Sequence, residues 1–69
     1  MSFSTSIKKV RLEALMTQKQ FAEALGVAFS TVNRWENQKA LPSFSTIRTI
    51  QAFCEERGID FDIKSIQEV

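Results

Sequence analysis

The sequence has 69 residues, the length of one small domain, and we expect residues 1–69 to form a single folding unit. Its net charge is +1 and 43% of its residues are apolar, which suffices for one core. His is absent and Cys54 is the single cysteine, which excludes an intramolecular disulfide and leaves too few ligands for a zinc site. No apolar run approaches the ~18 residues that a membrane span needs, and no apolar signal core follows the N-terminus. We therefore expect a cytoplasmic protein.

The charges are distributed unevenly along the sequence. Residues 1–50 hold seven Lys and Arg against three acids, a balance of +4, whereas residues 51–69 hold two against five, a balance of −3. A basic front and an acidic tail suit a molecule that presents one face to phosphate. Ordinary scatter of surface charge gives the same numbers, so charge alone does not select between the two interpretations.

Apolar residues at helical spacing predict an all-α domain of five helices, because only two Gly and one Pro interrupt the sequence. The first helix is expected over about Thr5–Leu15, with Ser4 or Thr5 as its N-cap. Its buried side should consist of the apolar residues at core spacing, namely Ile7, Val10, Ala14 and Leu15.

The second helix is expected over Gln18–Leu25. Thr17 and Gln20 have the spacing of a capping box at its start, and Gly26 supplies the positive φ that ends it. The small Ala22 allows a following helix to approach closely. A tight turn at Gly26 therefore predicts two helices that cross each other.

The third helix is expected over about Phe29–Asn37, with Val32 and Trp35 on its buried side. The other side exposes a set of residues that is rich in hydrogen-bonding groups and contains no acid: Phe29, Ser30, Thr31, Asn33 and Arg34. Two crossing helices, the second with such a face, are typical of a DNA-reading helix-turn-helix.

The fourth helix is expected over about Phe44–Arg57. Pro42 disfavours helical geometry before it, Ser43 caps its start, and Gly58 ends it. Its core residues should be Phe44, Ile47, Ile50, Phe53 and Cys54. A short fifth helix is expected over Phe61–Gln67, capped by Asp60, with Ile63 and Ile66 on its apolar side.

The third helix would enter the major groove of double-stranded DNA. Arg34 can take guanine O6 and N7, Asn33 can take adenine N6 and N7, and Phe29 can pack on a thymine methyl. The predicted base-reading residues are Phe29, Ser30, Asn33 and Arg34. The predicted phosphate contacts, at the start of the second helix and around the third, are Thr17, Gln18, Thr31, Asn37, Lys39 and Ser43.

The segment LxxxMTQKQFAEALGVAFSTVNRWENQKALPS carries a family resemblance. With it, residues 5–67 resemble the five-helix DNA-binding domain of the lambdoid phage repressor and Cro proteins. The resemblance implies that Gln18 contacts phosphate, that Phe29, Ser30 and Arg34 read bases with Asn33 beside them, and that Arg11 and Glu36 join the first helix to the third. It also implies a bacterial or phage repressor, or a Cro-like switch, that binds a pseudo-palindromic operator as a homodimer.

Two positions depart from the family pattern. The cap before the third helix is Ala28 instead of Ser or Thr, at an expected cost of ~1 kcal/mol. The Gly that often follows that helix is replaced by Gln38. Either Gln38 or Asn37 must then adopt the left-handed conformation, at about 1 kcal/mol.

An all-helical chain of this kind has alternatives in other functional classes. An antitoxin or adaptor-type protein-interaction module would use the third helix to contact a protein partner, in agreement with an exposed Phe29 and a low net charge. An enzyme has little support, because His, Tyr, a metal cluster and a Gly-rich phosphate loop are all absent. We expect no cofactor, no small-molecule substrate and no membrane partner. The expected dimer surface is made of Leu41, Phe61, Ile63 and Ile66.

Overall fold

The computed structural model describes residues 2–61, and it contains no strand in this part of the chain. Four helices occupy it: α1 (Phe3–Glu13), α2 (Gln18–Leu25), α3 (Phe29–Glu36) and α4 (Phe44–Arg57). The expected all-α class is confirmed, but the count of five helices is not. The expected fifth helix, Phe61–Gln67, lies outside the described residues except for Phe61, which is not helical. None of the helices described is long and apolar enough to cross a membrane.

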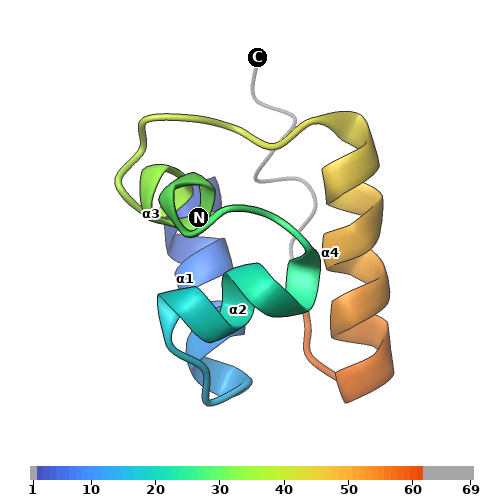
Figure 1. Cartoon of the computed structure of the whole chain (residues 1–69). Coiled ribbons are helices and arrows are strands. Elements are labelled where there is room, and N and C mark those ends of the chain that lie inside the picture. The colour runs from blue at the N-terminus through green and yellow to red at the C-terminus, as the bar shows by residue number, and fades with distance from the viewer. Residues whose placement is uncertain (1, 62–69) are drawn as a thin grey trace.

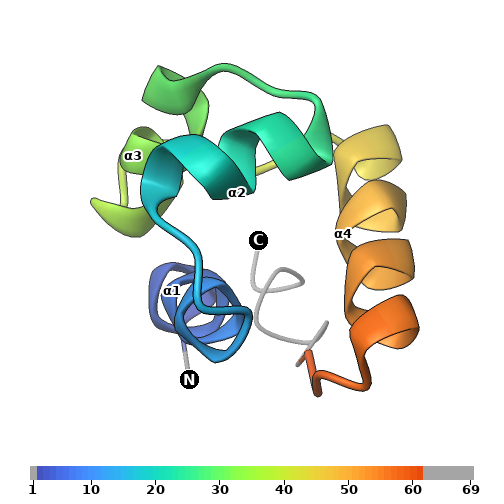
Figure 2. The ribbon, with the colours of Figure 1, turned by 60° about the horizontal axis from the view of Figure 1, so that its bottom comes forward.

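The four helices enclose one core. Helix α3 packs on both α1 and α2, and α4 packs on the other end of α2 (Figures 1 and 2). Trp35 of α3 is 2% exposed, and its ring packs edge-on against that of Phe3 with 5.9 Å between the ring centroids. Phe21 of α2 packs in the same way against Phe53 of α4, with 5.3 Å between the ring centroids. Each edge-on pair adds about 0.5–1.5 kcal/mol to the burial of its rings, so the two pairs fix α3 on α1 and α4 on α2.

Helix α1 begins and ends two residues earlier than the sequence predicts. Ser2 is its N-cap, and the Ser2 side chain accepts a hydrogen bond from the backbone N–H of Thr5. Phe3 therefore joins the core, at 3% exposure. Leu15 was expected on the buried side, and that expectation is wrong, because the helix ends before it and leaves it 90% exposed.

All four helices of the described chain end in the same kind of turn. After each, a residue with left-handed φ allows a backbone N–H to reach back to a carbonyl five residues earlier: Met16 to Arg11, Val27 to Ala22, Lys39 to Arg34 and Ile59 to Cys54. Gly26 and Gly58 take the left-handed position after α2 and α4, as expected. Leu15 takes it after α1 with φ 59° and Gln38 after α3 with φ 61°. Of the two candidates at the end of α3, the structure selects Gln38.

Helix α4 begins at the expected cap, where the Ser43 side chain accepts from the Thr46 N–H. Ile50, Phe53 and Cys54 are buried, but Phe44 is 77% exposed. The expectation that Phe44 joins the core is wrong. It occupies the first turn of α4, one turn before the half-buried Ile47, and the core of the described chain does not extend that far.

Candidate nucleic-acid interface

Helix α3 has one buried side and one exposed side. Val32 and Trp35 are 0% and 2% exposed and anchor the helix in the core. Phe29, Ser30 and Arg34 are exposed on the opposite side, where the sequence predicts them. Phe29, with half of its surface accessible, forms an apolar patch at the start of this face. Asn33 and Thr31 are only half-buried and lie at the edges of the face.

The turn between α2 and α3 sets the crossing of the two helices. Gly26 has φ 74°, Ala22 is 1% exposed, and α3 packs on α2. The cap of α3 is Ala28, which gives no side-chain hydrogen bond to the helix. The first N–H groups of α3 therefore lack the side-chain acceptor that Ser or Thr would supply, and the N–H of Thr31 donates to the Ala28 carbonyl at 3.0 Å instead.

A shallow hollow lies between α3 and the segment that leads into α4. It brings together residues that are distant in sequence, among them Thr31, Arg34, Leu41, Pro42, Ser43 and Thr46. Three of the predicted contact residues, Thr31, Arg34 and Ser43, thus share one surface. Sequence reasoning missed Thr46, whose hydroxyl lies 2.9 Å from that of Ser43. Its place three residues after a Ser cap is the signal that could have found it.

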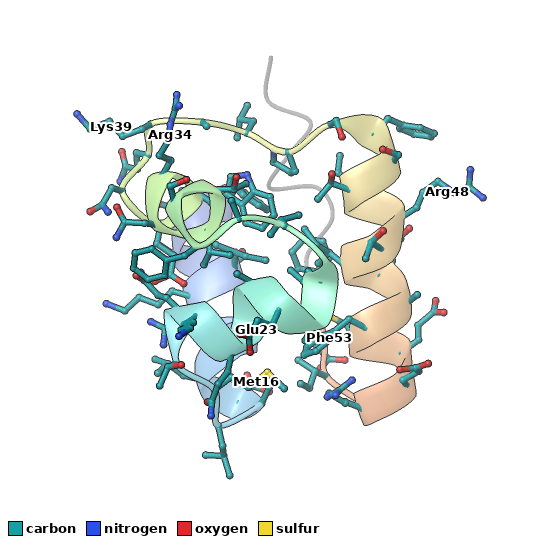
Figure 3. All side chains as sticks on the ribbon, in the orientation of Figure 1. Met16, Glu23, Arg34, Lys39, Arg48 and Phe53 are labelled. Carbon is teal, nitrogen blue, oxygen red and sulfur yellow. The ribbon has the colours of Figure 1, made fainter. Side chains whose placement is uncertain are left out.

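The charge on this surface is positive. Arg34 and Lys39 point away from the body of the protein at the same corner (Figure 3), whereas Arg48 extends from the outer side of α4. The one acid of α3 is Glu36, and its carboxylate is paired with Arg11. The exposed face of α3 therefore offers donors and positive charge to a ligand, with no uncompensated acid on the helix.

Arg11 and Glu36 form a largely buried ion pair between α1 and the end of α3. Arg11 Nε donates to Glu36 Oε2 at 2.7 Å and Nη2 donates to Oε1 at 3.0 Å, while Nη1 donates to the carbonyl of Met16 at 3.0 Å. The two side chains are 12% and 5% exposed. This bidentate geometry is the strongest form of an ion pair, and it holds the end of α3 on α1.

The ion pair continues into a chain of side-chain amides. Gln18 Nε2 donates to Glu36 Oε1 at 3.1 Å, and Asn33 Nδ2 donates to Gln18 Oε1 at 3.2 Å. Asn37 Nδ2 donates to the Asn33 side-chain oxygen at 3.2 Å and to the Asn33 carbonyl at 2.8 Å. We name Arg11, Glu36, Gln18, Asn33 and Asn37 the polar chain. It contains two predicted phosphate contacts, Gln18 and Asn37, and one predicted base reader, Asn33.

Sequence reasoning missed the polar chain as a unit. Its members come from α1, α2, α3 and the residue after α3, and several of its hydrogen bonds join residues 15 to 25 positions apart. Gln and Asn on a predicted surface look like solvated side chains. Only the crossing of the helices shows that they meet.

The start of α2 offers backbone donors beside Gln18. Thr17 and Gln20 form the predicted capping box, in which each side chain accepts from the other's backbone N–H. This uses the N–H of Gln20 and leaves those of Gln18 and Lys19 without intrahelical acceptors. Helix starts of this kind attract anions, so the predicted phosphate contacts Thr17 and Gln18 lie where phosphate is favoured.

Cys54 lies away from this surface, in the core, and is 2% exposed. Burial raises the pKa of its thiol to about 11 from a usual value of 9.0, and the nearby Glu13 carboxylate adds to the shift. The thiol is therefore protonated near neutral pH, which gives it the low reactivity of a structural cysteine. In residues 2–61 no group of three or more His, Cys, Asp or Glu side chains could hold a metal ion.

Comparison with known proteins agrees with this geometry. A helix-turn-helix family model matches residues 7–60, which include α2, α3, α4 and all but the first turn of α1. A type II methyltransferase, M1.ScrFI from Lactococcus lactis subsp. cremoris, is 42% identical over 55 residues. That match covers 75% of this chain but only 14% of the methyltransferase. No solved structure matches the chain significantly. The chain belongs to the helix-turn-helix family of DNA-binding domains, of the type found in the lambdoid repressor and Cro proteins.

Proposed function

We propose that this protein is a sequence-specific, double-stranded DNA-binding repressor of transcription that binds its operator as a homodimer. The observation that carries the proposal is the exposed side of α3. Apart from Phe29 it is polar, it has no uncompensated acid, and it carries Arg34, which points outward together with Lys39. Those are the features of a helix that enters the major groove between two phosphate backbones.

Base reading belongs to the exposed residues of α3. Arg34 has the reach and the forked donors for guanine O6 and N7. Ser30 can donate or accept, and Phe29 can pack on a thymine methyl. Phosphate contacts at the two edges of the groove would come from Thr17, Gln18, Thr31, Asn37, Lys39 and Ser43, most of which surround the face just described.

Dimerisation is part of the proposal because one domain of this size makes few phosphate contacts, which give weak binding at physiological salt. Leu41, in the segment between α3 and α4, is 54% exposed, and Phe44, in the first turn of α4, is 77% exposed. Phe61, also expected in the dimer surface, is half-buried and packs edge-on against Phe3 with 6.4 Å between the ring centroids. Ile63 and Ile66 lie outside the described residues. Sedimentation should show a dimer on operator DNA. A monomer both free and on DNA would contradict this part of the proposal.

The direct test of the proposal is selection of bound duplexes from a randomised pool, followed by affinity measurements on the selected duplex at two salt concentrations. The proposal predicts an enriched inverted repeat with half-sites about one helical turn apart and an affinity that falls steeply with salt. If no sequence is enriched and binding is absent, the DNA-reading function is wrong.

A second candidate function is a protein-interaction module of the antitoxin or adaptor type. Three of the exposed apolar side chains in the described part of the chain, Phe29, Leu41 and Phe44, favour it, because they lie on α3, in the segment after it or at the start of α4. Absence of salt-dependent duplex binding in the same experiment would select this candidate. We propose no catalytic role and no cofactor, and the activity of the methyltransferase is not assigned to this chain, which spans a small part of that enzyme.

A further inference from the structure

We infer that Asn33 is a positioning residue that holds the Gln18 amide ready for a DNA phosphate, and that base reading on α3 is left to Phe29, Ser30 and Arg34. The inference rests on the proposed DNA-binding function and assigns Asn33 a role within it that differs from base reading. It follows from the direction of the hydrogen bonds in the polar chain.

The orientation of each amide in the polar chain is fixed from one end. A carboxylate that is paired with a guanidinium can only accept, so the Gln18 group at 3.1 Å from Glu36 must be the donor, Nε2. Oε1 of Gln18 then faces Asn33 and can only accept. Asn33 must therefore present Nδ2, which lies 3.2 Å from it. A flip of either amide would set two donors or two acceptors against each other.

Asn33 is engaged at both ends of its amide. Nδ2 donates to Gln18, and Oδ1 accepts from Asn37 Nδ2 at 3.2 Å. A bidentate contact with adenine requires a donor and an acceptor of the same amide together. Each end of the Asn33 amide is already held inside the protein, so only the second Nδ2 proton and the second Oδ1 lone pair remain for a base, in the orientation that the two internal hydrogen bonds impose. The residue is also half-buried, whereas Ser30 and Arg34 on the same helix are exposed.

Gln18, in contrast, keeps a free donor. One Nε2 proton goes to Glu36, and the second remains for an acceptor outside the polar chain. Gln18 is the first residue of α2, where backbone N–H groups and the helix dipole already favour an anion. With Glu36 and Asn33 holding the two ends of the amide, the free donor is ordered before DNA arrives. Less side-chain entropy is then lost on binding.

A positioning role and a reading role differ in what a substitution does. Loss of a base reader weakens binding at one base position and relaxes preference there. Loss of a residue that acts through a phosphate contact weakens binding to all sequences alike. Because Gln18 is uncharged, losing its contact should also leave the salt dependence unchanged, in contrast to loss of a phosphate-binding Lys.

The experiment compares N33A, Q18A and the double variant with wild type on the selected duplex and on a set in which each base pair is changed in turn. N33A should weaken binding roughly 3–10-fold for every duplex, the range expected for loss of one net hydrogen bond. The double variant should bind within about twofold of Q18A alone, because Asn33 acts through Gln18. R34A is the matched control and should lose affinity mainly at one base position.

Thermal unfolding checks that each variant is folded. N33S, whose side chain is too short to reach Gln18, provides a second substitution with the same expected result.

A readout without DNA accompanies the binding data. In 1H–15N spectra of the free protein, the Gln18 side-chain amide signals should shift in N33A and stay in place in S30A. The inference is overturned by unmoved Gln18 signals, by a loss confined to one base position in N33A, or by additive losses in the double variant. Failure of the wild-type protein to enrich any duplex overturns the proposed function and this inference with it, whereas a base-specific loss in N33A overturns the inference alone.

Discussion

Glu36 is the residue on which the arrangement of the first three helices depends. It lies on α3, accepts two hydrogen bonds from Arg11 of α1, and accepts a third from Gln18 of α2. Its side chain is 5% exposed, so water contributes little to its solvation. One buried carboxylate thus connects three helices and sets the polarity of the polar chain.

Removing one partner of this ion pair should be far more harmful than removing both. Arg11→Met leaves the Glu36 carboxylate buried without its cation, and we expect a loss of ~3–5 kcal/mol in the free energy of unfolding. The double variant Arg11→Met/Glu36→Met should regain at least half of that loss, because no uncompensated charge remains. Urea denaturation of the three proteins measures both values. A single variant that costs below ~1 kcal/mol would show that the pair is solvated in solution.

Cys54 gives a pH dependence with a defined sign. Its folded-state pKa of about 11 lies above the usual 9.0, so the protonated thiol is favoured in the folded protein. The resulting stabilisation is complete below about pH 9 and is lost as the pH rises through 11. The shift corresponds to about 2–3 kcal/mol. Between pH 9 and 11, wild type should therefore lose more stability than Cys54→Ala, as measured by urea denaturation. Parallel curves for the two proteins would contradict the buried environment of the thiol.

At the scale of whole elements, the helix ends show where this sequence is not optimal for its own fold. All four helices end in a left-handed residue, but only two of those residues are Gly. Leu15 and Gln38 adopt the same conformation at a steric cost that Gly does not have. At the other end of α3, Ala28 lacks a capping side chain. Helix α3, which carries the proposed reading face, is therefore bounded by two unfavourable residues.

Replacing the left-handed residues by Gly tests this account of the helix ends. Gln38→Gly and Leu15→Gly should each stabilise the protein by ~0.5–1 kcal/mol, because relief of backbone strain exceeds the greater flexibility of Gly in the unfolded chain. Gly58→Ala is the matched control and should destabilise by a similar amount. A Cβ there meets no atom within 4 Å, so the backbone conformation is the main cost. Destabilisation by both Gly substitutions would contradict the assignment of left-handed turns to these positions.

The elements that the sequence predicted best are those with explicit end signals. The bounds of α2 and α4 agree with the expectation because Thr17, Ser43, Gly26 and Gly58 mark them. The bounds of α1 were displaced because Ser2, Ser4 and Thr5 are all acceptable caps and because nothing in Leu15 signals a left-handed turn. At the proposed site, too, the features that were predictable are those that a local sequence pattern marks. Exposure of Phe29, Ser30 and Arg34 comes from helical periodicity and was predictable, whereas the polar chain depends on how three helices cross.

At the scale of the whole molecule, charge is arranged along α4 as well as along the sequence. Arg34 and Lys39 point outward near the end of the protein where α4 begins (Figure 3), and α4 then runs away from them (Figure 1). Its last turn carries Glu55 and Glu56 together with Arg57, which pairs with Glu56 at 3.7 Å, so this end of α4 has one acid in excess. A duplex on the α3 face would meet positive charge, with the acids of α4 at the other end. A net charge of +1 is thus compatible with DNA binding because the sign separation provides the attraction.

The central claim, that the exposed face of α3 reads bases, is tested most directly by comparing Arg34→Ala with Lys39→Ala on the selected duplex and its single-base variants. We predict that Arg34→Ala loses ~1–3 kcal/mol of specific binding and relaxes preference at one base position. Lys39→Ala should weaken all duplexes alike and reduce the salt slope by about one. Uniform losses in both variants, with base preference intact, would show that α3 is not the reading element.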